Sequence, residues 1–218
     1  MRELTLSLST AISFFLSVTA FSASVLQWDF EGNLDATLGS EALKAEASFP
    51  EKLPKVTFET AIIGGREARV AHFSRGTYFR MNHSLSPNGG GAYVNQYTLI
   101  MDVMFPDLSP SGGWAALWQT NINNENDGDW FVGPTGGIGI SGNYGGRVIE
   151  GQWHRLALVV DLEAGTYTSY IDGVRVQQNT DLALDGRFAL DSVSLLFADD
   201  NGENAEGYVN SVQIRDSA

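Results

Sequence analysis

Apolar side chains recur at every second position along much of the chain after residue 24. The clearest run covers residues 97–105, with apolar groups at Tyr97, Leu99, Met101, Val103 and Phe105. A second run, residues 153–161, repeats the pattern through Leu156, Leu158 and Val160. A period of two places these groups on one face of an extended strand, and no amphipathic helix is evident after residue 24. The sequence therefore predicts an all-β protein.

Further short segments end at Gly, Asn, Asp or Pro, which are turn residues. Asp172-Gly173 is a strong hairpin signal after the segment 166–172. The stretch 35–55 is irregular and predicts a long connection. The remaining expected strands are 25–30, 68–73, 76–81, 113–119, 129–132, 137–141, 188–197 and 207–215. Many short strands without helices predict a two-sheet antiparallel jelly-roll sandwich, and we expect residues 25–218 to form one domain.

Residues 1–24 have the features of an export signal. Arg2 precedes an apolar stretch that reaches about Phe21, and the small residues Ala20 and Ser22 fit a cleavage pattern. The alternative is a buried N-terminal helix. We expect a secreted protein, extracellular or periplasmic, and of bacterial type. The chain has no cysteine, so its core alone must stabilise it.

The charge balance argues against two classes of partner. With 13 basic and 26 acidic side chains, the net charge is −13. Nucleic-acid binding needs a basic stripe, and an anionic membrane surface would repel this chain. We therefore expect no nucleic-acid partner and no membrane insertion after the signal is removed.

Two acidic loops could hold calcium. Residues 121–129 contain four Asn, two Asp and one Glu, and residues 199–204 are similar. Calcium takes six to eight oxygen ligands, commonly from flexible loops. The predicted ligands are Asp127, Asp129, Asp199 and Asp200, and the alternative is that both loops are simply solvated turns.

The aromatic residues near the first loop could hold a sugar, because protein–sugar contacts combine an aromatic face with polar side chains. The predicted ligand-binding residues are Trp130, Tyr144, Asn123 and Asn126. Trp114 and Trp118 are in phase and are expected on one buried face, while Trp28 and Trp153 are expected in the core. For each tryptophan, core packing is the alternative to a role in binding.

Enzyme motifs are weak in this chain. Gly137 to Gly142 matches a dinucleotide-binding spacing, but no helix can follow it. A glycosidase would need two close carboxylates, for which Asp127 with Asp129, or Glu203 with Glu206, are the candidates. Both pairs lie in Gly/Asn-rich loops that would position them poorly. We therefore expect no enzymatic activity.

Several motifs resemble LamG-like jelly-roll domains of the concanavalin A-like lectin/glucanase superfamily, in a bacterial secreted branch. They are Trp28–Leu34, Asn88-Gly-Gly-Gly, Asn95–Asp102, Gln152–Asp161 with its Trp-His pair, Tyr170-Ile-Asp-Gly-Val174 and a closing strand Val209–Arg215. The resemblance covers about residues 25–216. It implies a two-sheet sandwich, a calcium ion in rim loops, and binding of glycans or proteins. The acidic catalytic motif of the glucanase members is missing.

Together these features predict a secreted, non-catalytic module that binds a glycan or polysaccharide, with a calcium ion at the rim. Because one fold hosts many functions, two alternatives stay open. One is a protein–protein adhesion or envelope structural module that binds a protein surface. The other is a glycoside hydrolase or lyase without a recognised motif.

Overall fold

Alternating apolar residues form two antiparallel sheets in the computed structural model, which describes residues 25–39, 41–48, 52–122, 127–198 and 203–218. The larger sheet has eight strands: β13 (Val174–Asn179), β12 (Thr166–Ile171), β11 (His154–Asp161), β6 (Gln96–Met104), β15 (Gly207–Arg215), β4 (Arg66–Phe73) and β3 (Val56–Ile63) in order, with β1 (Leu26–Trp28) also paired to β15. The smaller sheet has seven: β10 (Asn143–Gly145), β9 (Ile138–Ile140), β8 (Asp129–Val132), β7 (Ala115–Gln119), β14 (Val193–Leu196), β5 (Thr77–Asn82) and β2 (Lys44–Ala47). A short 3-10 helix, η1 (Ser109–Ser111), precedes β7.

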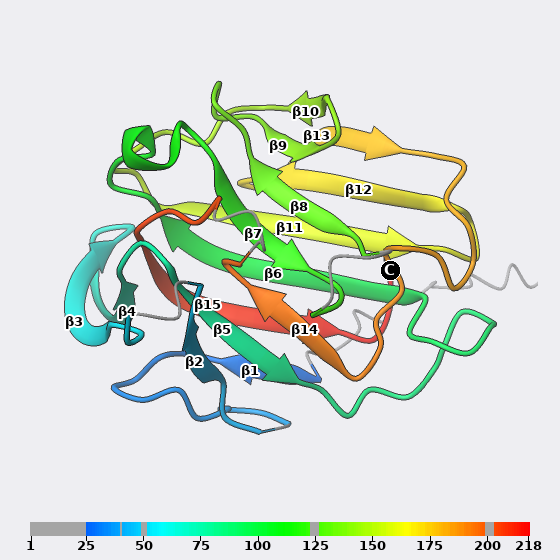
Figure 1. Cartoon of the computed structure of the whole chain (residues 1–218), viewed down its shortest axis with the longest axis horizontal. Coiled ribbons are helices and arrows are strands. Elements are labelled where there is room, and N and C mark those ends of the chain that lie inside the picture. Colours follow the sequence, from blue (N-terminus) through cyan, green and yellow to red (C-terminus); the bar gives the residue numbers. More distant parts are fainter. Residues whose placement is uncertain (1–24, 40, 49–51, 123–126, 199–202) are drawn as a thin grey trace, which may run out of the picture.

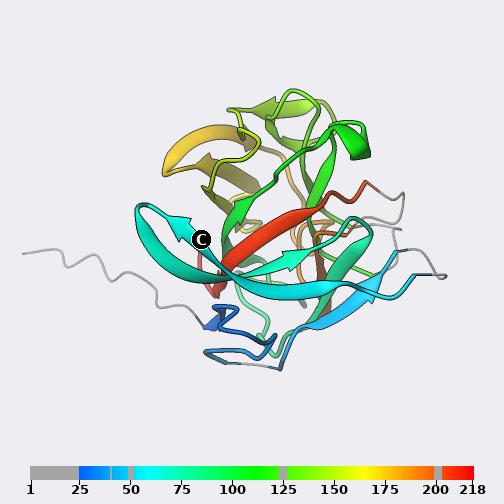
Figure 2. The ribbon, with the colours of Figure 1, turned by 90° about the vertical axis from the view of Figure 1, so that its left-hand side faces the viewer.

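The two sheets stack as layers, which Figure 1 shows face-on and Figure 2 from the side. The inner face of each sheet supplies the core. In β6, the predicted alternation is confirmed, because Tyr97, Leu99 and Met101 are fully buried while the residues between them are half-buried. A sandwich of two antiparallel sheets, as predicted, is therefore the fold of this chain.

The ends of the described chain meet in the larger sheet. β1 pairs with β15 in antiparallel register, with Trp28 opposite Val212. Trp28 is fully buried, as expected, and its indole Nε1 donates to the carbonyl of Glu41 at 3.2 Å. The predicted signal segment 1–24 lies outside the described residues. Within the described residues, no helix has the length and apolar character needed to cross a membrane.

Hydrogen bonds join the Trp-His motif at the start of β11 to the Ile-Asp-Gly motif at the end of β12. His154 donates from Nδ1 to Asp172 Oδ2 at 2.7 Å, and its Nε2 accepts from the backbone N–H of Ile149 at 3.0 Å. The other oxygen of Asp172 accepts from the N–H of Arg155. Asp172 (φ 51°) and Gly173 (φ 79°) make the predicted tight turn between β12 and β13.

Four strands were not predicted: β2, β3, β10 and β13. The segment 35–55, expected to be a connection, contains β2. Within the expected strand 188–197, only Val193–Leu196 forms a strand, β14. β2, β3, β10 and β13 are the terminal strands of the two sheets. Terminal strands pair on one side and are partly exposed, so their sequences lack the alternation that marks central strands.

A buried leucine tests the sheet-to-sheet core. Leu158 is fully buried on β11, whereas Leu53 is 85% exposed. Leu158→Ala should lower the free energy of unfolding by about 2–5 kcal/mol through lost burial and the cavity left behind. Leu53→Ala should change it by less than about 0.5 kcal/mol. Urea denaturation measures both, and equal effects would contradict this core.

His83 predicts a loss of stability in mild acid. Burial lowers the pKa of His83, and the neighbouring backbone and carboxylate of Asp191 offset this only in part. The unfolded chain then takes up the proton first, so stability is full above the ordinary histidine pKa and falls as pH drops below about 6.5. Denaturation between about pH 7.5 and pH 5.5 should show a shallower decline for His83→Asn than for wild type. Equal slopes would contradict the prediction.

Candidate functional site

A β-bulge in β7 decides which aromatic side chains reach the outer surface of the smaller sheet. Ala116 pairs with Phe131 and Trp118 pairs with Trp130, with a register shift between them. Trp118 and Trp130 consequently point into the core, and both are fully buried. Because Phe131 is adjacent to Trp130 on the same strand, it points to the opposite, outer face.

Trp114, Phe131 and Tyr144 form an aromatic cluster on this outer face. The Trp114 ring meets the Phe131 ring edge-on at 6.1 Å and the Tyr144 ring at 5.7 Å between centroids. Trp114 and Tyr144 are half-buried, whereas Phe131 is buried. Gly133 lies beside both half-buried rings. A Cβ added to it would be 3.4 Å from ring carbons of Tyr144 and 3.5 Å from a ring carbon of Trp114. Both rings therefore lie close to the backbone at Gly133.

Two carboxylates, those of Asp129 and Glu203, add polar groups to this aromatic cluster. Asp129 is two residues from Phe131 on β8 and so faces the same way. Burial raises the pKa of Tyr144, and the negative charges of Glu203 and Asp129 raise it further. The Tyr144 hydroxyl is therefore protonated at neutral pH and can donate a hydrogen bond, while the carboxylates can accept.

The strand that bears Tyr144 is held against the larger sheet. The side-chain amide of Asn143 bonds to the side chain of Asn179 and, at 3.4 Å, to the carbonyl of Gln178. An added Cβ on Gly145 would clash with the carbonyl oxygen of Val176. Glycine at this position lets β10 approach β13, and the contact closes one side of the sandwich beside the cluster.

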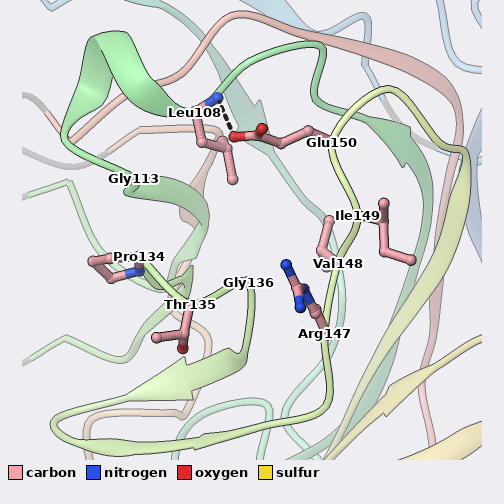
Figure 3. Close-up of a pocket in the computed structure, with 9 residues that line it drawn as sticks. All are labelled: Leu108, Gly113, Pro134, Thr135, Gly136, Arg147, Val148, Ile149 and Glu150. Atoms are coloured by element: carbon pink, nitrogen blue, oxygen red, sulfur yellow. Dashed lines mark hydrogen bonds between the residues drawn. The ribbon is translucent and has the colours of Figure 1, made fainter.

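A hollow of about 340 Å³ opens beside the start of β7 (Figure 3). It lies between the η1 loop, the turn 134–136 and the segment 147–150. The guanidinium of Arg147 lies between the turn and the segment, and Glu150 accepts from the N–H of Leu108 at 2.9 Å. Gly113 lines this hollow and is adjacent to Trp114, so the hollow and the cluster are neighbours.

Three tryptophan predictions need correction. Trp130 was expected to bind the ligand, but its ring is fully buried and its Nε1 donates to Ser169 Oγ at 3.1 Å. Trp114 was expected on one buried face with Trp118, but the bulge breaks their phase and Trp114 joins the outer cluster. Trp153 is half-buried at the start of β11 rather than in the core. Tyr144 is half-buried in the outer cluster, and its role in ligand binding stays a prediction.

The predicted metal residues are only partly described. Asn123, Asn126, Asp199 and Asp200 lie outside the described residues. Asp127 and Asp129 are both placed on the β7–β8 hairpin. In the described chain, no three His, Cys, Asp or Glu side chains are grouped as metal ligands.

Two buried polar side chains, Asp127 and Gln119, nevertheless lie in the β7–β8 hairpin. Asp127 is 4% exposed and Gln119 is 1% exposed. Asp127 Oδ2 and both polar side-chain atoms of Gln119 are buried without a hydrogen-bond partner. Nearby, Arg187 donates from Nε to the Asp127 carbonyl at 2.7 Å and lies 3.7 Å from an oxygen of Asp129. Burying a carboxylate oxygen without a hydrogen-bond partner costs free energy. A ligand or cation bound to the Asp127 oxygen would recover part of that cost.

Of the acidic pairs considered for catalysis, Glu203 and Glu206 have different neighbours in the structure. Glu206 Oε1 lies 2.8 Å from His72 Nε2, whereas the negative charge of Glu203 raises the pKa of Tyr144. The carboxylates that the fold brings to one aromatic residue are Asp129 and Glu203. They are 74 positions apart in the chain, so no spacing in the sequence could reveal them.

Comparisons with known proteins support the fold. No protein-family model and no curated protein matches the sequence. Among solved structures, the chain is similar to domain 4 of AbnA, a GH43 extracellular arabinanase from Geobacillus stearothermophilus, in complex with arabinotriose. The TM-score is 0.64 at 16% identity, covering 90% of this chain and 94% of that one.

The chain is also similar to botulinum neurotoxin binding domains, of which it spans about half the length. The serotype D binding domain matches with a TM-score of 0.57 at 14% identity, covering 89% of this chain and 47% of that one. The serotype D ligand binding domain in complex with N-acetylneuraminic acid matches with a TM-score of 0.54 at 14% identity, with the same coverages. The fold of this chain is thus shared with β-sandwich domains that were solved with sugars bound.

Proposed function

We propose that this protein is a secreted, non-catalytic module that binds a glycan on the outer face of the smaller sheet. The observation that carries the proposal is the half-exposed pair Trp114 and Tyr144, flanked by Asp129 and Glu203. Aromatic rings pack on the apolar faces of sugar rings, and the protonated phenol and the carboxylates match sugar hydroxyls.

The neighbouring hollow extends this platform. It adds Thr135 and Arg147 as further hydrogen-bonding groups beside Gly113. A chain of several sugar units could then lie from Tyr144 across Trp114 into the hollow. The similar folds that bind arabinotriose and N-acetylneuraminic acid support a carbohydrate ligand. They are binding or accessory domains, which supports a non-catalytic role. The motifs noted above favour a LamG-like branch, and the segment 1–24 favours export.

Calcium is the proposed cofactor, held at the β7–β8 hairpin. The support is the buried, unpartnered oxygen of Asp127 with Gln119 close by in the same hairpin and the carboxylate of Asp129. Hard oxygen donors of this kind suit calcium. Asp199 and Asp200 are the further proposed ligands.

Substitutions in the aromatic cluster test the glycan site. Trp114→Ala should weaken glycan binding by about tenfold or more, because a stacking surface is lost. Tyr144→Phe should weaken it about three- to tenfold, because one hydrogen bond is lost. Tyr93→Phe is the matched control, since Tyr93 is 42% exposed on a different loop.

The measurement begins with a glycan-array screen and continues with calorimetry on the best ligand. If no glycan binds above background, the glycan function fails and the protein-adhesion alternative takes its place. Release of reducing sugar from a polysaccharide panel would overturn the non-catalytic assignment.

Thermal melting tests the calcium site. Millimolar calcium should raise the melting temperature and chelator should lower it, because a ligand that binds only the folded state stabilises it. Asp127→Asn should remove most of this shift, whereas Asp161→Asn, a control on β11 in the other sheet, should keep it. A melting temperature that is insensitive to calcium and chelator would contradict the site.

A further inference from the structure

A cluster of positive charge surrounds a hollow of about 620 Å³ at the start of β3. Its cations are Lys52, Lys55 and Arg75, all exposed. The chain has three lysines in total and a net charge of −13, so two of the three lysines gather at this one hollow. Such local positive charge on an acidic protein attracts an anion that the rest of the surface repels.

The backbone around this hollow is held in place. Lys55 donates its N–H to Thr77 Oγ1 at 3.0 Å, and its carbonyl accepts from the N–H of Ser74 at 3.2 Å. The turn is closed by the N–H of Thr77 on the Ser74 carbonyl, and Ser48 donates to the Gly76 carbonyl at 2.8 Å. The segments that bear Lys55 and Arg75 are thus fixed relative to each other, which lowers the entropic cost of binding.

The acidic residue at this hollow is engaged elsewhere. Glu206 Oε1 lies 2.8 Å from Nε2 of His72, whose ring stacks on Tyr208 at 4.5 Å. Lys55 and Arg75 therefore outweigh the carboxylate of Glu206 among the residues that line the hollow. The exposed side chain of Leu53 completes the lining and offers an apolar contact for a sugar ring.

From this geometry we infer a second binding site, which takes the carboxylate or sulfate groups of an acidic polysaccharide. Lys55 and Arg75 supply charge-assisted hydrogen bonds to the anion. Nucleic acid is a poor match, since neutralising its phosphates takes a basic stripe rather than one small hollow, and an anionic membrane would face a broad area of the acidic surface. The inference rests on the proposed function for the nature of the ligand, and it adds that this glycan is acidic.

Two forms of one polymer test the inference. Polygalacturonate and its methyl ester share a backbone and differ in charge. At low ionic strength, wild type should bind the charged form about tenfold more tightly than the ester, and about 0.5 M salt should remove most of the difference. Calorimetry measures both affinities.

Variants test whether the hollow causes the preference for the charged polymer over its ester. The double variant Lys55→Gln with Arg75→Gln should bind the two polymers equally. Arg66→Gln, at the opposite end of the β3–β4 hairpin, is the matched control and should keep the preference. Unchanged melting temperatures would show that all variants are folded.

The outcomes separate this inference from the proposed glycan platform. If wild type binds both polymers equally, or the double variant keeps the preference, the acidic-glycan site is overturned while the platform stands. If Trp114→Ala lowers both affinities by the same factor, both sites are supported. If Trp114→Ala has no effect on either polymer but the double variant does, the hollow is supported and the platform fails.

Discussion

The packing of the two inner sheet faces is the interaction on which the rest of this structure depends. The chain has no cysteine, so no disulfide assists the core. Strands β6, β11 and β15 each bury alternate side chains against the smaller sheet. Because successive side chains of a strand point to opposite faces, the residues between the buried ones face outward. The outer surface of the smaller sheet, including its aromatic cluster, follows from this division.

Local departures from regular pairing then shape the candidate site. The bulge in β7 turns Trp118 inward and lets Trp114 remain outside. Glycine at 145 allows the close approach between β10 and β13. Bulges and glycines in strands commonly redirect side chains in this way. The site is thus a consequence of a few irregular positions on a regular scaffold.

Charge is divided between two surfaces of opposite character. Asp129 and Glu203 make the aromatic cluster acidic, while Lys55 and Arg75 make the hollow at β3 basic. An acidic cluster suits neutral sugar hydroxyls or a bound cation, and a basic hollow suits a carboxylate or sulfate. A mixed polysaccharide with neutral and acidic units would satisfy both surfaces at once.

The sequence by itself determined the fold class, because strict alternation in segments such as 97–105 allows only strands with one buried face. It also indicated the Asp172-Gly173 turn, since a tight turn depends on neighbouring residues. Tertiary structure decided the rest. The exposed terminal strands lack alternation, the bulge puts Trp114 and Trp118 on different faces, and Asp129 and Glu203 come near the same tyrosine only after folding. Such long-range contacts depend on sheet register, which no local pattern in the chain specifies.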